Sequence, residues 1–462
     1  MKLKFIALLF FLLNLISCTD ADQKKNSIFF GGQIINPSSN FVRLYRDNKT
    51  IDSLILDQNF RFQKKFDSLD SGIYKLEHIP EYQSVFLENG DSIWVRINAS
   101  AFQESLVYSG KGAIKNNFLM DLYLHQEREN DFLSSKYSQD SESFNHLIDS
   151  LLLQKKELWI EMDSLSELSP IAQKITQATY IYPYATKRER YALLRGTFWS
   201  AEDDSIFFDF RKYLNYGDND LALFDPYVNY LMNYINEKAL DSGEYYFQAK
   251  QKKGYNIRRL KVLDREIKGN KVRNNLARAI AYEEILNFEN HEDHDNFLQF
   301  YAVVNTSQKD LSEVLNLHLD ISGMQAKEKL PSLTLQKVDA SLISSDEIIS
   351  QQPTVIYFWS QTQMKHYKST LERVAMFQRK YPKFRYVGIC IQPFNKMVAQ
   401  VQDMMSVDQN DQYAIVDFEN ASKTWVITLL NKGIIIDSNG SILEGFGNFS
   451  DDKFEEILMK NN

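Results

Sequence analysis

The period of the apolar residues changes twice along this chain of 462 residues, which limits the folds it can adopt. Over residues 28–112, short segments of alternating apolar and polar residues are separated by turn sequences, as in Ile93–Ile97 after Asn89-Gly90-Asp91. Such spacing is typical of a small antiparallel β-sandwich. Over residues 113–329, apolar residues recur every three or four positions, which predicts an all-α domain.

Residues 330–462 alternate strand and helix patterns. The run Thr354–Trp359 is almost wholly apolar, as expected of a strand that is buried on both faces. Helical spacing follows around Leu371, then a second apolar strand at Phe384–Ile391 and a hairpin turn at Asp437–Gly440. The chain is therefore predicted to be an α+β multidomain protein, with a β-sandwich, a central all-α domain and a C-terminal α/β domain.

Residues 1–17 have the pattern of a secretory signal peptide. Lys2 and Lys4 precede the apolar run Phe5–Ile16. That run is too short to cross a bilayer, which takes about 20 residues. The segment is therefore expected to direct export and to be removed.

The end of this segment, Leu15-Ile16-Ser17-Cys18, resembles the bacterial lipobox. The resemblance implies that Cys18 is the lipidated first residue of the mature chain, and its acyl chains would anchor the protein to a membrane. Residues 18–27 would then form the lipidated tether. Thr19, in the position after the cysteine, resembles outer-membrane sorting signals. We expect an outer-membrane location, on either the periplasmic side or the cell surface.

Charge and cysteine content exclude several classes of function. The formal net charge is −8, which argues against a nucleic-acid partner. The only cysteines are Cys18 and Cys390, so a disulfide framework and a cysteine-based zinc site are excluded. The sequence contains no phosphate-binding glycine loop, no nucleophile elbow and no His-Glu-x-x-His motif. No cofactor, metal ligand or catalytic residue is therefore predicted.

The C-terminal region contains four phrases: Leu330-Pro331-Ser332-Leu333, Val355-Ile356-Tyr357-Phe358-Trp359-Ser360, Tyr386-Val387-Gly388-Ile389 and Ile435-Ile436-Asp437-Ser438-Asn439-Gly440-Ser441-Ile442. They resemble the thioredoxin-like family of periplasmic thiol-disulfide oxidoreductases, the TlpA, ResA and AhpC/TSA group. The resemblance implies a thioredoxin-like fold over residues 330–462. In the first domain, Ile51-Asp52-Ser53 and Gly72-Ile73-Tyr74 resemble the N-terminal domain of many Bacteroidota thioredoxin-like lipoproteins.

The resemblance fails at the residues that perform the family's chemistry. The family has Trp-Cys-x-x-Cys at the start of the first helix, where the helix dipole lowers the pKa of the attacking thiol. Aligned on Phe358-Trp359, Thr362 stands in the position of that Trp, and Gln363 and His366 stand in the positions of the two cysteines. Asn431 stands where the family has a cis-proline. Because a non-proline residue strongly prefers a trans peptide bond, the peptide-binding groove is expected to be reshaped.

Two residues could replace the missing thiols. Cys390 lies within an apolar strand, where a thiol is usually an inert small hydrophobic group. His366 could act as an acid or base, since imidazole titrates near neutral pH. A helix N-terminus disfavours its charged form, however, and the sequence offers no paired nucleophile. Cys390 is therefore interpreted as an inert structural thiol, and His366 as a solvated residue at the edge of a former active site, with acid–base catalysis as the alternative.

Histidines and acids gather at His291-Glu292-Asp293-His294. This cluster is interpreted as a polar loop that caps the next helix, with metal binding as the alternative. The remaining histidines show no ligand spacing: His78, His125, His146 and His318. No metal site is predicted.

Two further features could mark binding surfaces. Tyr227, Tyr230 and Tyr234 share one helical face, which indicates an interhelix seam or, alternatively, a carbohydrate or peptide platform. The stretch Lys250–Arg278 is basic within an acidic chain. It is either a solvated helical face or a contact with an anionic surface.

The leading hypothesis is an outer-membrane lipoprotein with a redox-inactive thioredoxin-like domain that serves as a binding or assembly module for an envelope protein complex. Its partners would be the membrane, through the lipid on Cys18, and an envelope protein. One alternative is an enzyme related to the thiol-disulfide oxidoreductases. Another is a glycan- or peptide-binding lipoprotein. Fold alone does not decide among them.

Overall fold

The computed structural model describes residues 27–47, 49–79, 81–195, 206–286, 294–349, 352–361, 363–394 and 407–461. The chain forms two compact units, divided in the sequence between Ala277 and Arg278, and each is described by itself. Helix α11 (Asn270–Ile285) spans that division. The division therefore falls inside the region 113–329 that the sequence assigns to one helical domain.

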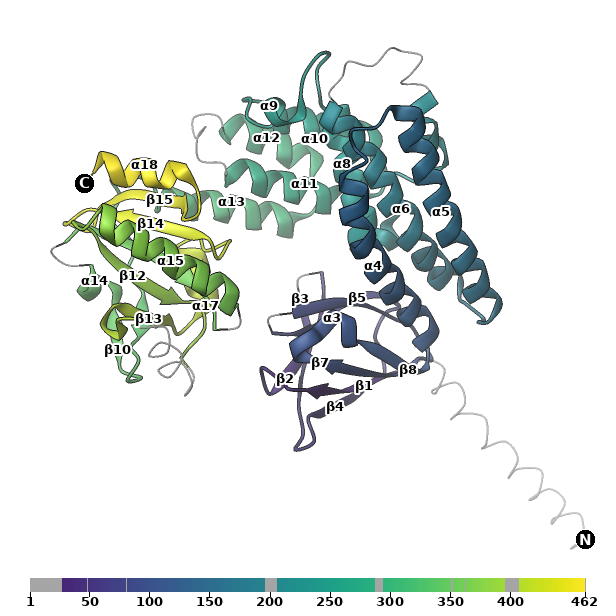
Figure 1. Ribbon diagram of the computed structural model, residues 1–462, viewed down its shortest axis with the longest axis horizontal. Helices are drawn as coiled ribbons and strands as arrows, with labels where there is room; N and C mark the ends of the chain where they lie inside the picture. Colours follow the sequence, from purple (N-terminus) through teal and green to yellow (C-terminus); the bar gives the residue numbers. More distant parts are fainter. Residues whose placement is uncertain are drawn as a thin grey trace, which may run out of the picture. The chain divides into compact units, whose positions relative to one another are not determined.

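The first unit begins with two four-stranded sheets (Figure 1). One sheet has the order β4-β1-β7-β8, formed by β1 (Ile28–Ile35), β4 (Arg61–Phe66), β7 (Ser92–Asn98) and β8 (Val107–Lys111). The other has the order β3-β2-β5-β6, formed by β2 (Phe41–Arg46), β3 (Lys49–Ile55), β5 (Gly72–His78) and β6 (Glu81–Leu87). One prediction is corrected here. The sandwich is not antiparallel throughout, because β1 and β7 run parallel. Between β1 and β7 the chain forms the other sheet, which consists of β2, β3, β5 and β6. It then returns to the first sheet, where β7 pairs with β1 in the same direction.

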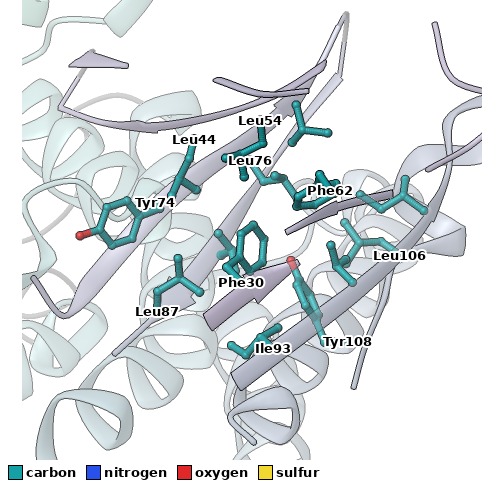
Figure 2. Close-up of a cluster of buried hydrophobic side chains, with 14 of the residues drawn as sticks. Phe30, Leu44, Leu54, Phe62, Tyr74, Leu76, Leu87, Ile93, Leu106 and Tyr108 are labelled. Atoms are coloured by element: carbon teal, nitrogen blue, oxygen red, sulfur yellow. The ribbon is translucent and has the colours of Figure 1, made fainter. Parts of the chain in front are cut away.

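Apolar side chains from the two sheets pack into one core (Figure 2). Phe30 on β1 lies 5.7 Å from Phe62 on β4, measured between ring centroids. Leu44 and Leu76 face this core from the other sheet and are fully buried. Strand alternation places these residues on inner faces, and their burial supplies most of the driving force for the sandwich.

Two short helical elements, η1 (Ala99–Ala101) and α3 (Phe102–Ser105), lie between β7 and β8. The other helices of this unit follow the sandwich in the sequence. The larger helices of this unit are α4 (Ala113–Ser134), α5 (Ser141–Ser164), α6 (Pro170–Arg195), α8 (Asp225–Lys238) and α10 (Tyr255–Glu266). Shorter elements are η2 (Asp209–Tyr213), η3 (Asn219–Leu221) and α9 (Tyr246–Ala249). Helix α6 packs against α4, α5 and α8 (Figure 1). The start of α5 is capped by Asp140, which accepts a hydrogen bond from the Ser143 amide at 2.8 Å.

Two adjacent asparagines join α4 to both sheets. Asn116 accepts from the Phe86 amide and donates to the Phe86 carbonyl, both at 2.8 Å. Asn117 makes the same pair of bonds to Tyr108, both at 2.9 Å. Phe86 and Tyr108 lie on the edge strands β6 and β8, whose outer backbone groups would otherwise lack partners. The first turn of α4 therefore closes one end of the sandwich.

The second unit contains the rest of α11 and two helices, α12 (His294–Val304) and α13 (Gln308–Ser322), followed by a seven-stranded sheet of order β10-β9-β13-β12-β11-β14-β15. The strands are β9 (Thr334–Gln336), β10 (Leu342–Ser344), β11 (Thr354–Trp359), β12 (Arg385–Cys390), β13 (Gln412–Ile415), β14 (Lys432–Ile436) and β15 (Ile442–Asn448). The remaining elements are α14 (Ser345–Ile348), α15 (Met364–Lys380), η5 (Gln409–Asp411), α17 (Phe418–Thr424) and α18 (Asp452–Lys460).

The order of these elements confirms the predicted thioredoxin-like arrangement. The central strand β11 is buried along its whole length and pairs in parallel with β12 and antiparallel with β14. Helices α15 and α18 cover one face of the sheet (Figure 1). Phe377 of α15, Phe454 of α18 and Tyr357 of β11 belong to one buried cluster on that face. On the opposite face, Phe358 contacts Trp425 at 6.3 Å between ring centroids.

Candidate functional site

The start of α15 is the position where the resemblance would place two thiols. Gln363 occupies the N-cap, without a side-chain capping hydrogen bond, and His366 lies in the first turn. Thr362 lies outside the described residues, as do the side chains of Met364 and Lys365. The end of β11 and the first turn of α15 pack together, since the ring of the buried Trp359 stacks on Tyr367 with 4.0 Å between centroids.

The structure brings His366 and Asn431 together, although they are far apart in the sequence. The Nε2 of His366 is hydrogen-bonded to the Oδ1 of Asn431. Since a carboxamide oxygen only accepts, Nε2 is the donor and holds a proton. The residues in the predicted positions of the second cysteine and of the cis-proline therefore contact each other, one in the first turn of α15 and the other directly before β14.

A polar hollow of about 680 Å³ surrounds this contact. It is lined by His366, Ser369, Thr370, Glu372, Arg373, Met376, Asn431 and Ser450. Arg373 is held by a 3.0 Å hydrogen bond from its guanidinium to the Asp451 carbonyl. The hollow offers hydroxyls, a carboxylate, a guanidinium and an imidazole, so it suits reversible polar contacts rather than thiol exchange.

Cys390 ends β12 and lies opposite Trp359 in the neighbouring strand. It is fully buried. Burial raises the pKa of its thiol to about 11, and weak bonds with Gln392 and Gln361 only partly oppose this. The Gln361 amide lies 3.5 Å from Sγ. Because the thiolate is the reactive form, the geometry supports the interpretation of Cys390 as structural.

We expect Cys390 to resist alkylation in the native protein. In a Cys18→Ser chain, where Cys390 is the remaining cysteine, iodoacetamide at pH 8 should label at least about 10²-fold more slowly than a free cysteine. The measurement is intact mass against time, with urea-unfolded protein as the positive control. Labelling of the native chain at the unfolded rate would contradict the burial.

Sequence reasoning missed Lys432, the first residue of β14 and the neighbour of Asn431. Its side chain is buried, with Nζ 4.6 Å from the centre of the Phe446 ring. Burial lowers the pKa of Lys432 to about 7, and the Glu444 carboxylate only partly opposes the shift. Nothing in the pattern Lys-Gly-Ile-Ile-Ile marks the lysine as buried, since a strand end is usually solvated.

The predicted histidine cluster is described only in part, because His291, Glu292 and Asp293 lie outside the described residues. His294 is buried at the start of α12, and its ring lies 5.4 Å from that of His318 on α13. Over the ranges that the structure covers, no three histidine, cysteine, aspartate or glutamate side chains gather as a metal site would require. His78 has a structural role, since it accepts from the Ser38 amide at 3.1 Å.

The tyrosine stripe lies in the helical core, which confirms the interpretation as an interhelix seam. Tyr227 and Tyr230 are fully buried on α8, and Tyr234 is 6% exposed. Tyr182 on α6 meets Tyr227 edge to face, with ring centroids 4.7 Å apart. Rings packed in this way cannot offer a flat surface to a ligand.

Acidic neighbours neutralise much of the basic stretch Lys250–Arg278. Glu244 pairs with Lys252 at 2.8 Å and with Arg258 at 2.7 Å. Arg278 pairs with Glu313 at 3.1 Å within the second unit. These ion pairs favour the interpretation as a solvated helical face, and the contact with an anionic surface stays a prediction.

Cys18 and the rest of residues 1–26 lie outside the described residues. Among the helices that are described, none is long and apolar enough to cross a bilayer.

No protein-family model matches the chain, and no curated protein matches it. Solved structures do match, over about 30% of the chain. One is the thioredoxin domain of a thiol-disulfide oxidoreductase from Bacteroides vulgatus, with 14% identity over 29% of this chain and 98% of that one, at a TM-score of 0.25. The C-terminal domain of a protein described as a thiol-disulfide oxidoreductase from Bacteroides thetaiotaomicron matches with 20% identity over 30% of this chain and 98% of that one, at a TM-score of 0.25. A thiol:disulfide interchange protein from Bacteroides sp. matches with 13% identity over 29% and 89%, at a TM-score of 0.24. The structures similar to this chain are thus thioredoxin-like proteins, and the similarity extends over less than a third of it.

Proposed function

We propose that this chain is an outer-membrane lipoprotein, anchored through Cys18, whose thioredoxin-like domain binds a protein of the envelope and performs no disulfide exchange. The observation that supports this most strongly is the hydrogen bond between His366 and Asn431 at the position where thiols would stand. Dithiol exchange needs an accessible thiolate and a second thiol to resolve the mixed disulfide. Gln363 and His366 provide neither.

The polar hollow around His366 is the proposed contact surface. Arg373 and Glu372 place opposite charges side by side, and Ser369 is exposed between them and the His366–Asn431 pair. Mixed charge of this kind favours a polar protein surface over a lipid or an apolar ligand.

The test is purification of the full chain from native membranes in mild detergent, followed by mass spectrometry. A stoichiometric envelope partner should be recovered with the wild type, and Ser369→Arg, which fills the hollow, should reduce its recovery at least about tenfold. Gln378→Arg is the matched control, because Gln378 is an exposed residue on the same helix outside the hollow. Equal recovery with both variants would reject the hollow as the contact surface.

The alternative is an oxidoreductase-related enzyme, which should reduce insulin. If the chain is a binding module, as we propose, the wild type should show no insulin reduction above background. The double variant Gln363→Cys/His366→Cys should form an intramolecular disulfide, because a helix N-cap and the residue three positions later are close enough to be bridged. Mass spectrometry after alkylation detects it, and Gln378→Cys/His366→Cys is the control that should stay reduced. Insulin reduction by the wild type that Cys390→Ser abolishes would favour the enzyme instead.

A further inference from the structure

The first unit contains a cleft of about 410 Å³ between the sandwich and the helices. Strand β6 forms one wall with Tyr82 and its neighbours, and α3 adds Gln103. Helices α4, α6 and α8 form the remaining walls. A volume in this range is typical of small-molecule sites, which usually lie where structural elements from different layers meet.

A proline inside α6 fixes part of the wall. Pro183 has no backbone N–H, so the carbonyl of Thr179, four residues earlier, loses its helical partner. Gln126 on α4 replaces that partner, donating from Nε2 to the Thr179 oxygen at 2.9 Å. The bond orients the Gln126 side chain and leaves its Oε1 as an acceptor at the cleft.

Other wall side chains are also held in place. Tyr123 donates from its hydroxyl to Oε1 of Gln103 at 3.2 Å, which leaves the Gln103 amide nitrogen as a donor. Lys187 donates to Oδ1 of Asn130 at 2.7 Å. Donors and acceptors are thus positioned before any ligand arrives, which lowers the entropy cost of binding.

The charges of the wall nearly cancel. The wall contains three acidic residues (Glu81, Glu127 and Asp225) and two basic ones (Lys187 and Arg190). Asp225 also forms an ion pair with Lys75 at 3.6 Å. A phosphate or carboxylate ligand would need an excess of cations. An apolar ligand would leave the oriented amides without hydrogen-bond partners, which disfavours its binding.

Tyr82 supplies an aromatic surface in the wall of the cleft. Tyr82 lines the cleft and is 52% exposed, and the Lys75 Nζ lies 4.9 Å from the centre of its ring. An exposed tyrosine ring offers an apolar face for C–H groups together with a polar hydroxyl. A ligand that matches both the ring and the amides is uncharged, bears apolar C–H faces and has many hydroxyls, each able to donate and accept.

We propose that this cleft binds a short, uncharged oligosaccharide, with Tyr82 stacking on a sugar ring and Gln103 and Gln126 bonding its hydroxyls. The site is in the first unit, so it is separate from the proposed contact surface around His366. Each can fail without the other.

The test is isothermal titration calorimetry of the full chain with four neutral trisaccharides: maltotriose, cellotriose, mannotriose and triacetylchitotriose. At least one should bind saturably. Tyr82→Ala and Gln103→Leu should each weaken that binding at least about tenfold, which equals about 1.4 kcal/mol. Tyr213→Ala is the matched control, because Tyr213 is 81% exposed and lies outside the cleft.

Unchanged thermal unfolding of each variant shows that the loss is local. The proposal is overturned if no neutral trisaccharide binds, or if Tyr82→Ala and Gln103→Leu bind as the wild type does. It is also overturned if trigalacturonate or a neutral tripeptide binds while the four sugars do not.

Discussion

Replacing Lys115 with methionine should destabilise the first unit by about 3–5 kcal/mol, because it leaves the buried Asp91 carboxylate and the partly buried Glu88 carboxylate without their cation. The Lys115 ammonium lies 2.8 Å from Asp91 and 2.5 Å from Glu88. The side chains of Lys115 and Asp91 are each only 4% exposed. Burial raises the pKa of Asp91, and Lys115 opposes that rise. Removing the ammonium therefore leaves a costly charge or forces protonation.

The loss of stability caused by Lys115→Met should be greatest where the sandwich meets the helices. Hydrogen–deuterium exchange should accelerate in β6 and in the first turns of α4, where Asn116 holds the edge strand, and calorimetry should show a lower unfolding temperature. Lys111→Met, at an exposed position on β8, is the matched control and should change stability by less than about 0.5 kcal/mol. Adding Glu88→Gln and Asp91→Asn to Lys115→Met should recover part of the loss. Equal stability of the two single variants would show that the buried cluster contributes nothing.

Replacing Lys432 should increase the stability of the folded chain, whereas replacing Lys115 lowers it, because burying the Lys432 ammonium opposes folding. Its pKa is about 7 in the folded chain and about 10.4 in an unfolded one. Between these values the unfolded chain binds more protons, so stability should rise with pH from about 7 to about 10. Below about pH 7 both states are protonated, and the full cost of the buried charge remains.

Lys432→Met should therefore stabilise the second unit at neutral pH by a few kcal/mol, up to about 4 if the whole shift applies. The substitution should also reduce the increase in stability between about pH 7 and about pH 10. Calorimetry of the full chain at pH 7 and pH 9 measures both effects, and Lys460→Met, at an exposed site on α18, is the control. Destabilisation by Lys432→Met, or an unchanged pH dependence, would show that the ammonium has a stabilising partner.

The sequence by itself was sufficient for the elements whose signal is local. The apolar run Thr354–Trp359 became the buried strand β11, and the turn at Asp437–Gly440 joins β14 to β15. Periodicity predicts such elements because burial on one or two faces requires it. The absence of both family cysteines also needs no structure, since Gln363 and His366 follow from the alignment on Phe358-Trp359.

Only the tertiary structure decided how distant side chains meet. The parallel pairing of β1 with β7, the contact of His366 with Asn431 and the bond from Gln126 to Thr179 all join residues far apart in the sequence. The burial of Lys432 likewise depends on Phe446 and on the strands beside it. Local propensity holds no information on these pairings, because they arise when whole faces pack and each buried polar group must find a partner.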